Sequence, residues 1–89
     1  MRAAFFRTHG GPDVLEIGEA PEPVVASGTV VVGVRAVALN HLDLWVRRGI
    51  PGLDLELPHI GGSDISGVIE EVGPAVDGWA VGDRVAVNP

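Results

Sequence analysis

Residues 58–73 constrain the fold most, because this stretch changes character halfway along. Its first half holds one proline and two glycines within five residues, which excludes regular secondary structure there. Its second half, residues 64–72, sends side chains alternately to two faces, as a β-strand does. Gly67 inside that strand indicates a β-bulge or the close approach of another backbone. The pattern predicts a glycine-rich loop that delivers Ser63 and Asp64 to the start of a strand, although the glycines could also serve geometry alone.

Turn-forming residues recur along the whole chain, which has 13 Gly and 7 Pro among 89 residues. This frequency favours short strands over long helices. Strands are predicted at 3–7, 14–19, 29–39, 64–72 and 84–87, and the first two form a hairpin. Residues 29–39 are apolar on both faces apart from Arg35, which is typical of a strand buried on both sides. The sequence therefore predicts a mainly β fold, a partly open antiparallel barrel.

One segment, residues 40–48, has helical periodicity, with apolar residues that recur every three to four positions. Asn40 is a favourable N-cap, Asp43 lies in the first turn, and two arginines lie in the last turn, as the helix dipole favours. Gly49, followed closely by a proline, is a typical helix stop. We therefore expect one short helix over about 40–48.

Charge and composition argue against several functional classes. Twelve acidic and six basic residues give a net charge of -6, which makes nucleic acid an unsuitable partner. There is no cysteine, so disulfides and thiolate metal sites are excluded within these residues. No run approaches the ~18 apolar residues of a membrane span, and the N-terminus lacks the pattern of a signal peptide. We expect a cytoplasmic protein with no membrane partner.

Three motifs occur in a specific order: Asn-His-Leu-Asp at 40–43, Gly-Gly-Ser-Asp-Ile-Ser-Gly at 61–67 and Gly-Asp-Arg-Val at 82–85. With this order and spacing, the whole chain, 1–89, resembles the N-terminal GroES-like catalytic domain of the medium-chain dehydrogenase/reductase superfamily. That superfamily includes zinc alcohol dehydrogenases and quinone oxidoreductases. The resemblance implies a longer enzyme in which a Rossmann domain follows in cis and binds NAD(P)(H), and which is a homo-oligomer when full-length. The chain stops directly after a strand, so we expect a truncated domain without activity of its own.

Departures from the zinc-enzyme pattern imply that a catalytic zinc is absent. The resemblance places a cysteine ligand where this chain has Asn40 and a histidine ligand where it has Ser63, with Asp64 as the acidic residue that follows. A neutral amide and a hydroxyl are poor zinc ligands. Leu42 also replaces the Ser or Thr of a proton relay. The pattern matches the zinc-free, quinone oxidoreductase-like branch. A structural zinc, held in many relatives just beyond the position of residue 89, falls outside this sequence.

The resemblance also implies which residues form the site. The catalytic positions are Asn40 and Asp43, and the substrate and cofactor cleft has His41, Trp45, Ser63 and Asp64. Asn40 would cap the helix and also hydrogen-bond the substrate oxygen as that oxygen gains charge, while Asp43 would position Asn40 or a backbone group. The alternative role for Trp45 is that of a buried core residue. The alternative for His41 is that of an exposed helix residue without a function in the site. We expect His9 and His59, both in loops, to take no part in the chemistry.

These inferences together predict an NAD(P)-dependent oxidoreductase, either a quinone or enone reductase or an alcohol dehydrogenase-like protein. Hydride would pass to or from a small carbonyl, quinone or alcohol substrate, with the cofactor supplying the chemistry. The alternative is a stand-alone GroES-like barrel that acts as a binding or assembly module. Such a module needs a mobile apolar loop, and residues 52–57, where acids alternate with leucines, give it weak support.

Overall fold

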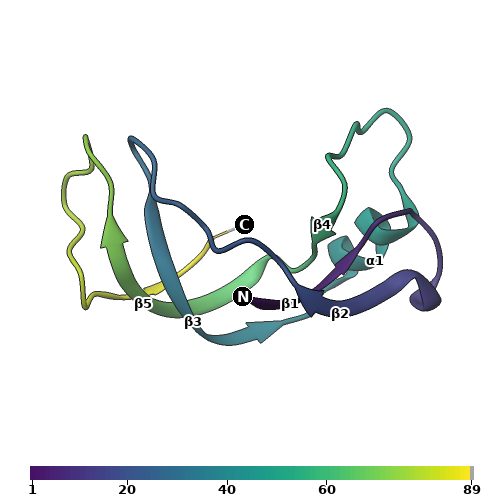
Figure 1. The fold of residues 1–89 in the computed structure, drawn as a ribbon, viewed down its shortest axis with the longest axis horizontal. Helices are drawn as coiled ribbons and strands as arrows, with labels where there is room; N and C mark the ends of the chain where they lie inside the picture. Colours follow the sequence, from purple (N-terminus) through teal and green to yellow (C-terminus); the bar gives the residue numbers. More distant parts are fainter. Residues whose placement is uncertain (89) are drawn as a thin grey trace. The chain divides into compact units, whose positions relative to one another are not determined.

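The computed structural model describes residues 1–88 and divides them into two compact units. Unit 1 consists of Met1–Pro21 and Leu39–Ser63, and unit 2 consists of Glu22–Ala38 and the residues from Asp64 onward. Each unit contains one three-stranded antiparallel sheet (Figure 1). The mainly β prediction is confirmed, and the strands form two sheets without closing into a barrel.

The sheet of unit 1 has the strand order β2-β1-β4. Strand β1 (Arg2–Phe6) pairs along its whole length with β2 (Leu15–Glu19) and, at its end, with β4 (His59–Ile60). A 3-10 helix, η1 (Pro12–Val14), leads into β2, and its proline occupies a first-turn position where no N–H donor is needed. The predicted hairpin is confirmed. Neither η1 nor β4 was predicted, because elements of two or three residues are too short to show a periodic pattern.

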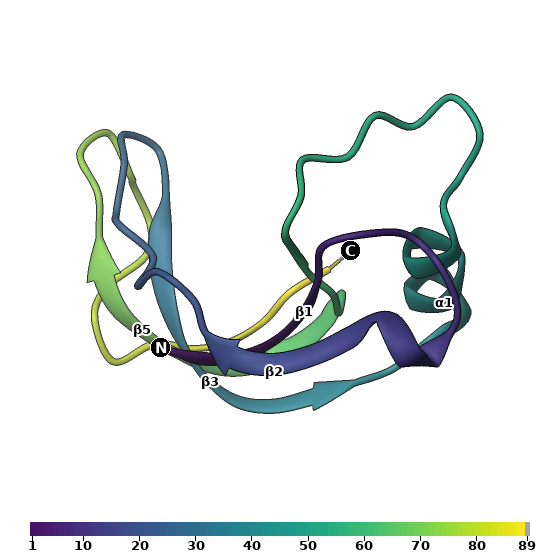
Figure 2. The same cartoon turned by 45° about the vertical axis from the view of Figure 1, so that its right-hand side comes forward.

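Unit 1 also contains the α-helix, α1 (His41–Arg48), which confirms the helix predicted over 40–48 (Figure 2). The helix ends where Gly49 adopts φ 98°, a region that glycine enters without steric cost. The Gly49 N–H donates to the carbonyl oxygens of Trp45 at 3.0 Å and Val46 at 3.2 Å. No helix in the described residues is long and apolar enough to cross a membrane.

The core of unit 1 is centred on two consecutive phenylalanines of β1. Phe5 and Phe6 keep only 6% and 2% of their surface exposed. The Phe6 ring lies 5.8 Å from the ring of His9 and 5.4 Å from that of His59, measured between centroids. His9, in the loop after β1, and His59, in β4, therefore pack against the core of this unit. The prediction that His59 lies in a loop is wrong, because β1 pairs with it as an edge partner.

The sheet of unit 2 has the order β3-β5-β6, with β3 at Val30–Ala38, β5 at Asp64–Val72 and β6 at Arg84–Ala86. These bounds match the predicted strands to within one residue at each end. Ile69, in the central strand, is buried to 1% exposure and marks the core of this unit. Gly67, two positions earlier on β5, lies on the same face as Ile69 and is also buried.

The close approach predicted at Gly67 is confirmed. A Cβ atom added there would lie 2.3 Å from the carbonyl oxygen of Gly33 on β3, which only glycine avoids. The ladder is also irregular beside this point, because Val34 pairs with Gly67 while Ala36 pairs with the preceding residue of β5. Arg35 is thus the extra residue of a β-bulge on β3.

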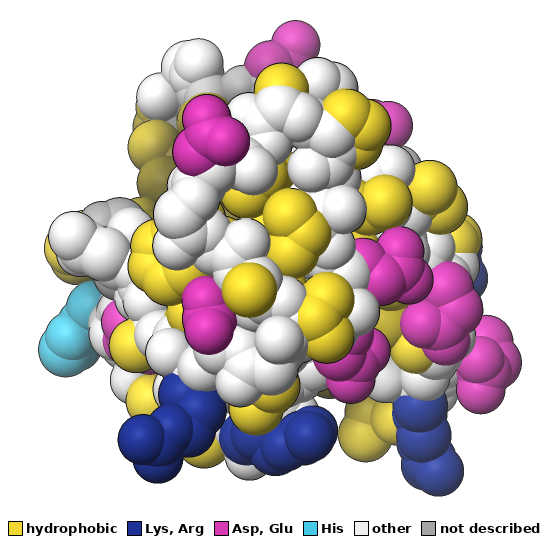
Figure 3. Space-filling model, turned by 90° about the vertical axis from the view of Figure 1, so that its left-hand side faces the viewer, with side chains coloured by type: hydrophobic (Ala, Val, Ile, Leu, Met, Phe, Trp, Pro, Cys, Tyr) yellow, Lys and Arg dark blue, Asp and Glu magenta, His cyan; other side chains and the backbone are white. Residues whose placement is uncertain are grey.

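The expectation that residues 29–39 are buried on both faces is wrong. Within β3, Val34 and Val37 keep 51% and 69% of their surface exposed. Strand β3 is an edge strand of its sheet, and no second layer from the described part of unit 2 covers its C-terminal half. Apolar side chains on both faces of a strand can be buried, but they are buried only where another element packs against each face. Apolar side chains accordingly reach the molecular surface (yellow in Figure 3).

Candidate functional site

The N-terminus of α1 is closed by a reciprocal cap between Asn40 and Asp43. Asn40 has an extended backbone, with φ -137° and ψ 176°, and its side-chain oxygen Oδ1 accepts the N–H of Leu42 at 2.8 Å. In return, the Asn40 backbone N–H donates to Oδ2 of Asp43 at 3.0 Å. This arrangement satisfies two backbone donors that a helix start otherwise leaves without a partner. The predicted cap is confirmed.

The Asp43 carboxylate also reaches beyond the helix. Its other oxygen, Oδ1, accepts the backbone N–H of Gly62 at 3.2 Å, across 19 residues of sequence. One side chain therefore ties the start of α1 to the glycine-rich loop before β5. Ser63 follows Gly62 directly, so this bond fixes the backbone that leads to Ser63. Such a geometry suits a positioning carboxylate, whose part in a reaction stays a prediction.

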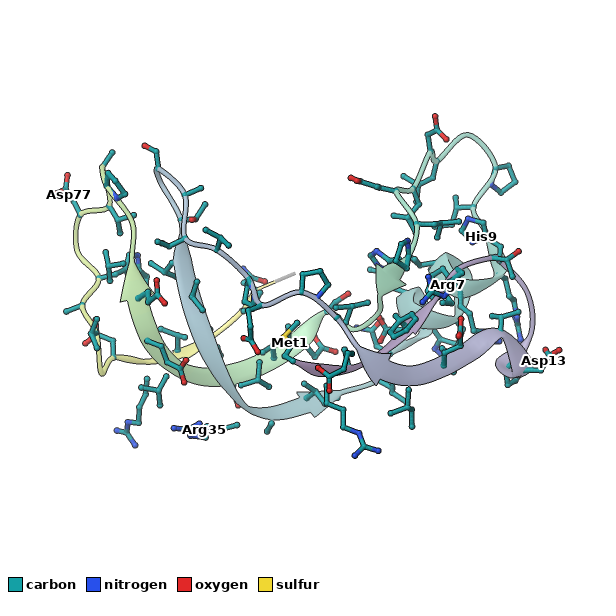
Figure 4. The ribbon with its side chains drawn as sticks, in the orientation of Figure 1. Met1, Arg7, His9, Asp13, Arg35 and Asp77 are labelled. Carbon is teal, nitrogen blue, oxygen red and sulfur yellow. The ribbon has the colours of Figure 1, made fainter. Side chains whose placement is uncertain are left out.

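The C-terminus of α1 is held by a second set of contacts, made by the loop after β1. His9 donates through Nδ1 to the carbonyl oxygens of Val46 at 3.1 Å and Arg47 at 3.3 Å. The Gly10 N–H donates to the same Arg47 carbonyl at 3.0 Å, and Arg47 Nε donates to the Gly10 carbonyl at 3.1 Å. We call this set the helix clamp; Figure 4 labels His9 at its position in the loop. Donors near the last turn satisfy carbonyls that a helix end leaves open.

The helix clamp was missed by sequence reasoning, which assigned His9 no role beyond the loop. That His9 and His59 take no part in the chemistry stays a prediction. A histidine that caps a helix 37 residues away leaves no local pattern. Arg47, which completes these contacts, is buried to 8% exposure, and its burial cannot be predicted from the sequence because arginine is mostly exposed in proteins.

Two aromatic side chains on α1 are open to the surface. His41 is exposed, and Trp45 keeps 56% of its surface exposed, so the alternative of Trp45 as a core residue is wrong. Their rings lie 6.3 Å apart between centroids, inclined by 31°. Trp45 and the residues after the helix, among them Ile50 and Pro51, line a hollow of about 340 Å³. A place for His41 and Trp45 in a cleft stays a prediction.

The remaining predicted site residues, Ser63 and Asp64, lie where the sequence passes from unit 1 to unit 2. Ser63 ends unit 1, whereas Asp64 opens β5 in unit 2 and pairs there with Ala38. The structure brings Asn40, Asp43 and the backbone before Ser63 together within unit 1. The predicted convergence of Asp64 on this group stays a prediction.

The donor atoms near the α1 N-terminus do not fit a tetrahedral zinc site. The Asn40 amide oxygen accepts a backbone N–H, and each oxygen of Asp43 also accepts one. Zinc prefers thiolate, imidazole and carboxylate ligands, and three protein ligands are needed at a catalytic site. No group of three or more such side chains gathers anywhere in residues 1–88.

Comparison with known proteins gives consistent matches. The mouse quinone oxidoreductase is 37% identical over 86 residues, covering 96% of this chain and 26% of its own length. Among solved structures, an NAD-dependent alcohol dehydrogenase superposes with a TM-score of 0.90 at 50% identity, over 100% of this chain and 26% of that one. The Escherichia coli quinone oxidoreductase complexed with NADPH has a TM-score of 0.86 at 30% identity, with 97% and 26% covered.

The chain spans about a quarter of the length of the curated relatives it matches. These relatives are oxidoreductases, which favours the first function predicted from the sequence over the stand-alone binding module. The family model for the alcohol dehydrogenase GroES-like domain matches residues 26–89, well over half of the sequence. Together with the two antiparallel sheets and the single short α-helix, this match shows that the chain belongs to the alcohol dehydrogenase GroES-like domain family.

Proposed function

We propose that this chain is the N-terminal catalytic part of an NAD(P)-dependent oxidoreductase that transfers hydride to or from a small carbonyl, quinone or alcohol. The observation that carries the proposal is the α1 N-terminus, where Asn40 and Asp43 form one hydrogen-bonded unit with the glycine-rich loop. Relatives named alcohol dehydrogenase and quinone oxidoreductase support it, as does a similar structure complexed with NADPH. A Rossmann domain in cis, NAD(P)(H) as cofactor and a homo-oligomeric, cytoplasmic whole protein belong to the same proposal.

In this proposal Asn40 is the catalytic donor. Its Oδ1 accepts the Leu42 N–H at 2.8 Å, and this bond fixes the orientation of the amide plane. The amide nitrogen is the group that donates to the substrate oxygen as charge develops on that oxygen. Removing one such preorganised donor from an active site costs about 3 kcal/mol in the barrier. The nicotinamide, when bound, supplies or accepts the hydride.

Asp43 acts by positioning. The carboxylate holds the Asn40 backbone at 3.0 Å and the Gly62 backbone at 3.2 Å. Ordering both segments before the substrate arrives removes that entropic cost from the reaction. His41, Trp45, Ser63 and Asp64 form the surrounding cleft in the proposal, and the exposed face of Trp45 offers a flat wall for a planar group.

The proposed site works without a catalytic zinc, because Asn40 and Ser63 occupy positions where the zinc enzymes carry ligands. A structural zinc beyond residue 89 is compatible with this proposal. Metal analysis of the whole protein tests it, with any cysteines of a structural site substituted. We expect no zinc in that variant and unchanged turnover after treatment with a chelator. One zinc per chain, lost together with activity on chelation, contradicts the proposal.

The catalytic role of Asn40 can be separated from its capping role by two substitutions. Asn40→Asp keeps a capping oxygen but lacks the amide donor, whereas Asn40→Ala loses both. We expect turnover of the whole protein with NADH or NADPH and a small quinone or aldehyde to fall roughly 100-fold in both variants. The unfolding transition should move only for Asn40→Ala. Turnover by Asn40→Asp equal to that of the unsubstituted protein refutes the donor role.

A further inference from the structure

A groove in unit 1 lies between α1, the sheet and the glycine-rich loop. It shares no lining residue with the hollow beside Trp45. Its volume is about 190 Å³. Phe6 of β1, Leu15 of β2 and Leu44 of α1 line it, together with Leu39, which lies between β3 and the helix. Because sites for drug-sized ligands begin at roughly 300 Å³, the occupant of this groove must be compact. We call it the Arg47 groove, after the cation that lines it.

Arg47 is more than nine-tenths buried, with 8% of its surface exposed. Its Nε donates to the Gly10 carbonyl at 3.1 Å. Within the described residues its two terminal nitrogens form neither a hydrogen bond nor an ion pair. No fully buried side-chain nitrogen of these residues lacks a partner, so both terminal nitrogens must touch accessible space. The Arg47 groove is accessible space that this residue lines.

The neighbouring carboxylate does not neutralise this cation directly. Asp43 lies one helical turn before Arg47 and lines the same groove. Each of its oxygens accepts a backbone N–H, one from Asn40 and one from Gly62, and it forms no ion pair with Arg47. A buried guanidinium with unused donors favours an incoming anion, since desolvating a cation without a counter-charge is costly.

We propose that the Arg47 groove binds a monocarboxylate with a compact apolar body. The guanidinium presents parallel N–H donors that match both oxygens of a carboxylate, and charge-assisted bonds of this kind are the strongest that side chains make. The apolar body packs against Phe6, Leu15 and Leu44. The groove shares Asp43 and Gly62 with the proposed hydride-transfer site, but its binding is read from amide shifts and does not depend on hydride transfer.

Benzoate and benzyl alcohol are the matched probes, because they share a ring and differ in charge. Each is titrated into the purified, ¹⁵N-labelled whole protein and followed by amide chemical shifts. We expect benzoate to shift the amides of Phe6, Leu44 and Gly62 and to bind roughly 10- to 100-fold more tightly than benzyl alcohol. Equal affinities, shifts confined to other residues, or no binding of benzoate at millimolar concentration each overturn the proposal.

Two substitutions of the same charge sharpen the test. Arg47→Met removes the cation of the groove, whereas Arg48→Met removes its exposed neighbour on α1. We expect benzoate affinity to fall roughly 10- to 100-fold in Arg47→Met and to stay within a factor of two in Arg48→Met. Equal losses in both variants indicate non-specific charge attraction and overturn the site. If Arg47→Met does not fold, the comparison of benzoate with benzyl alcohol on the unsubstituted protein decides.

Discussion

Replacing Asp43 by Asn tests whether one carboxylate holds both the helix and the loop. The substitution keeps the size of the side chain and removes its charge. An amide offers only one oxygen, so it can accept from Asn40 or from Gly62 but not from both as the carboxylate does. Its NH₂ group then faces a backbone N–H, which leaves one donor without an acceptor.

The size of the effect follows from the two bonds. The bond at the Asn40 N–H belongs to a helix cap and is partly buried, which makes it worth about 1 kcal/mol. The bond at the Gly62 N–H is solvent-exposed, so we assign it only about 0.5–1 kcal/mol. Because the amide keeps one of these two bonds, Asp43→Asn should lower the free energy of unfolding by about 0.5–1 kcal/mol, the contribution of the bond that is lost.

Urea denaturation followed by circular dichroism measures this difference, and Asp54→Asn provides the control. Asp54 is exposed in the loop after the helix, so the same charge change there should alter the free energy of unfolding by less than about 0.5 kcal/mol. Amide shifts of Gly62 should also change in Asp43→Asn and not in Asp54→Asn. Equal stability of the two variants refutes the argument that the carboxylate joins helix and loop.

Two further substitutions have matched controls. Gly67→Ala places a Cβ 2.3 Å from the Gly33 carbonyl oxygen and should lower the free energy of unfolding by about 2 kcal/mol or more. Gly61→Ala, whose added Cβ has nothing within 4 Å, should change it by less than about 0.5 kcal/mol. Thermal unfolding compares the two variants, and similar losses contradict the close approach at Gly67. His9→Ala removes the donor to two helix carbonyls and should lower the free energy of unfolding by about 1 kcal/mol. His41→Ala, at an exposed position, should lower it by less than half of that. Equal urea midpoints for the two variants contradict the helix clamp.

Elements with strong local signals could be predicted from the sequence. Strand β5 matches the predicted residues 64–72, and α1 starts directly after the predicted cap at Asn40. The cap, the glycine stop and the side-chain alternation each depend on residues within one or two turns of each other. The interactions that stabilise these features form between neighbouring residues, so a short segment of sequence is enough to predict them.

Contacts between distant segments could not be predicted. The bond from Gly62 to Asp43 spans 19 residues, and the bond from His9 to Val46 spans 37. Strand β4 has two residues and exists only because β1 offers it an edge. The prediction that β3 is buried on both faces was wrong for a related reason, since an apolar sequence does not show which element covers the strand. Such outcomes depend on the whole fold, which a single segment does not encode.

The bond between Asp43 and Gly62 also has a consequence for protein engineering. This bond brings residues 43 and 62 together, so the loop between them has two fixed ends. The helix end holds the loop at Gly49, and pairing with β1 holds it at His59–Ile60. Doubling the length of a loop with fixed ends costs only about 0.6 kcal/mol. Residues 50–58 therefore form a cassette that can be lengthened or exchanged while the helix, the strand and Asn40 keep their places.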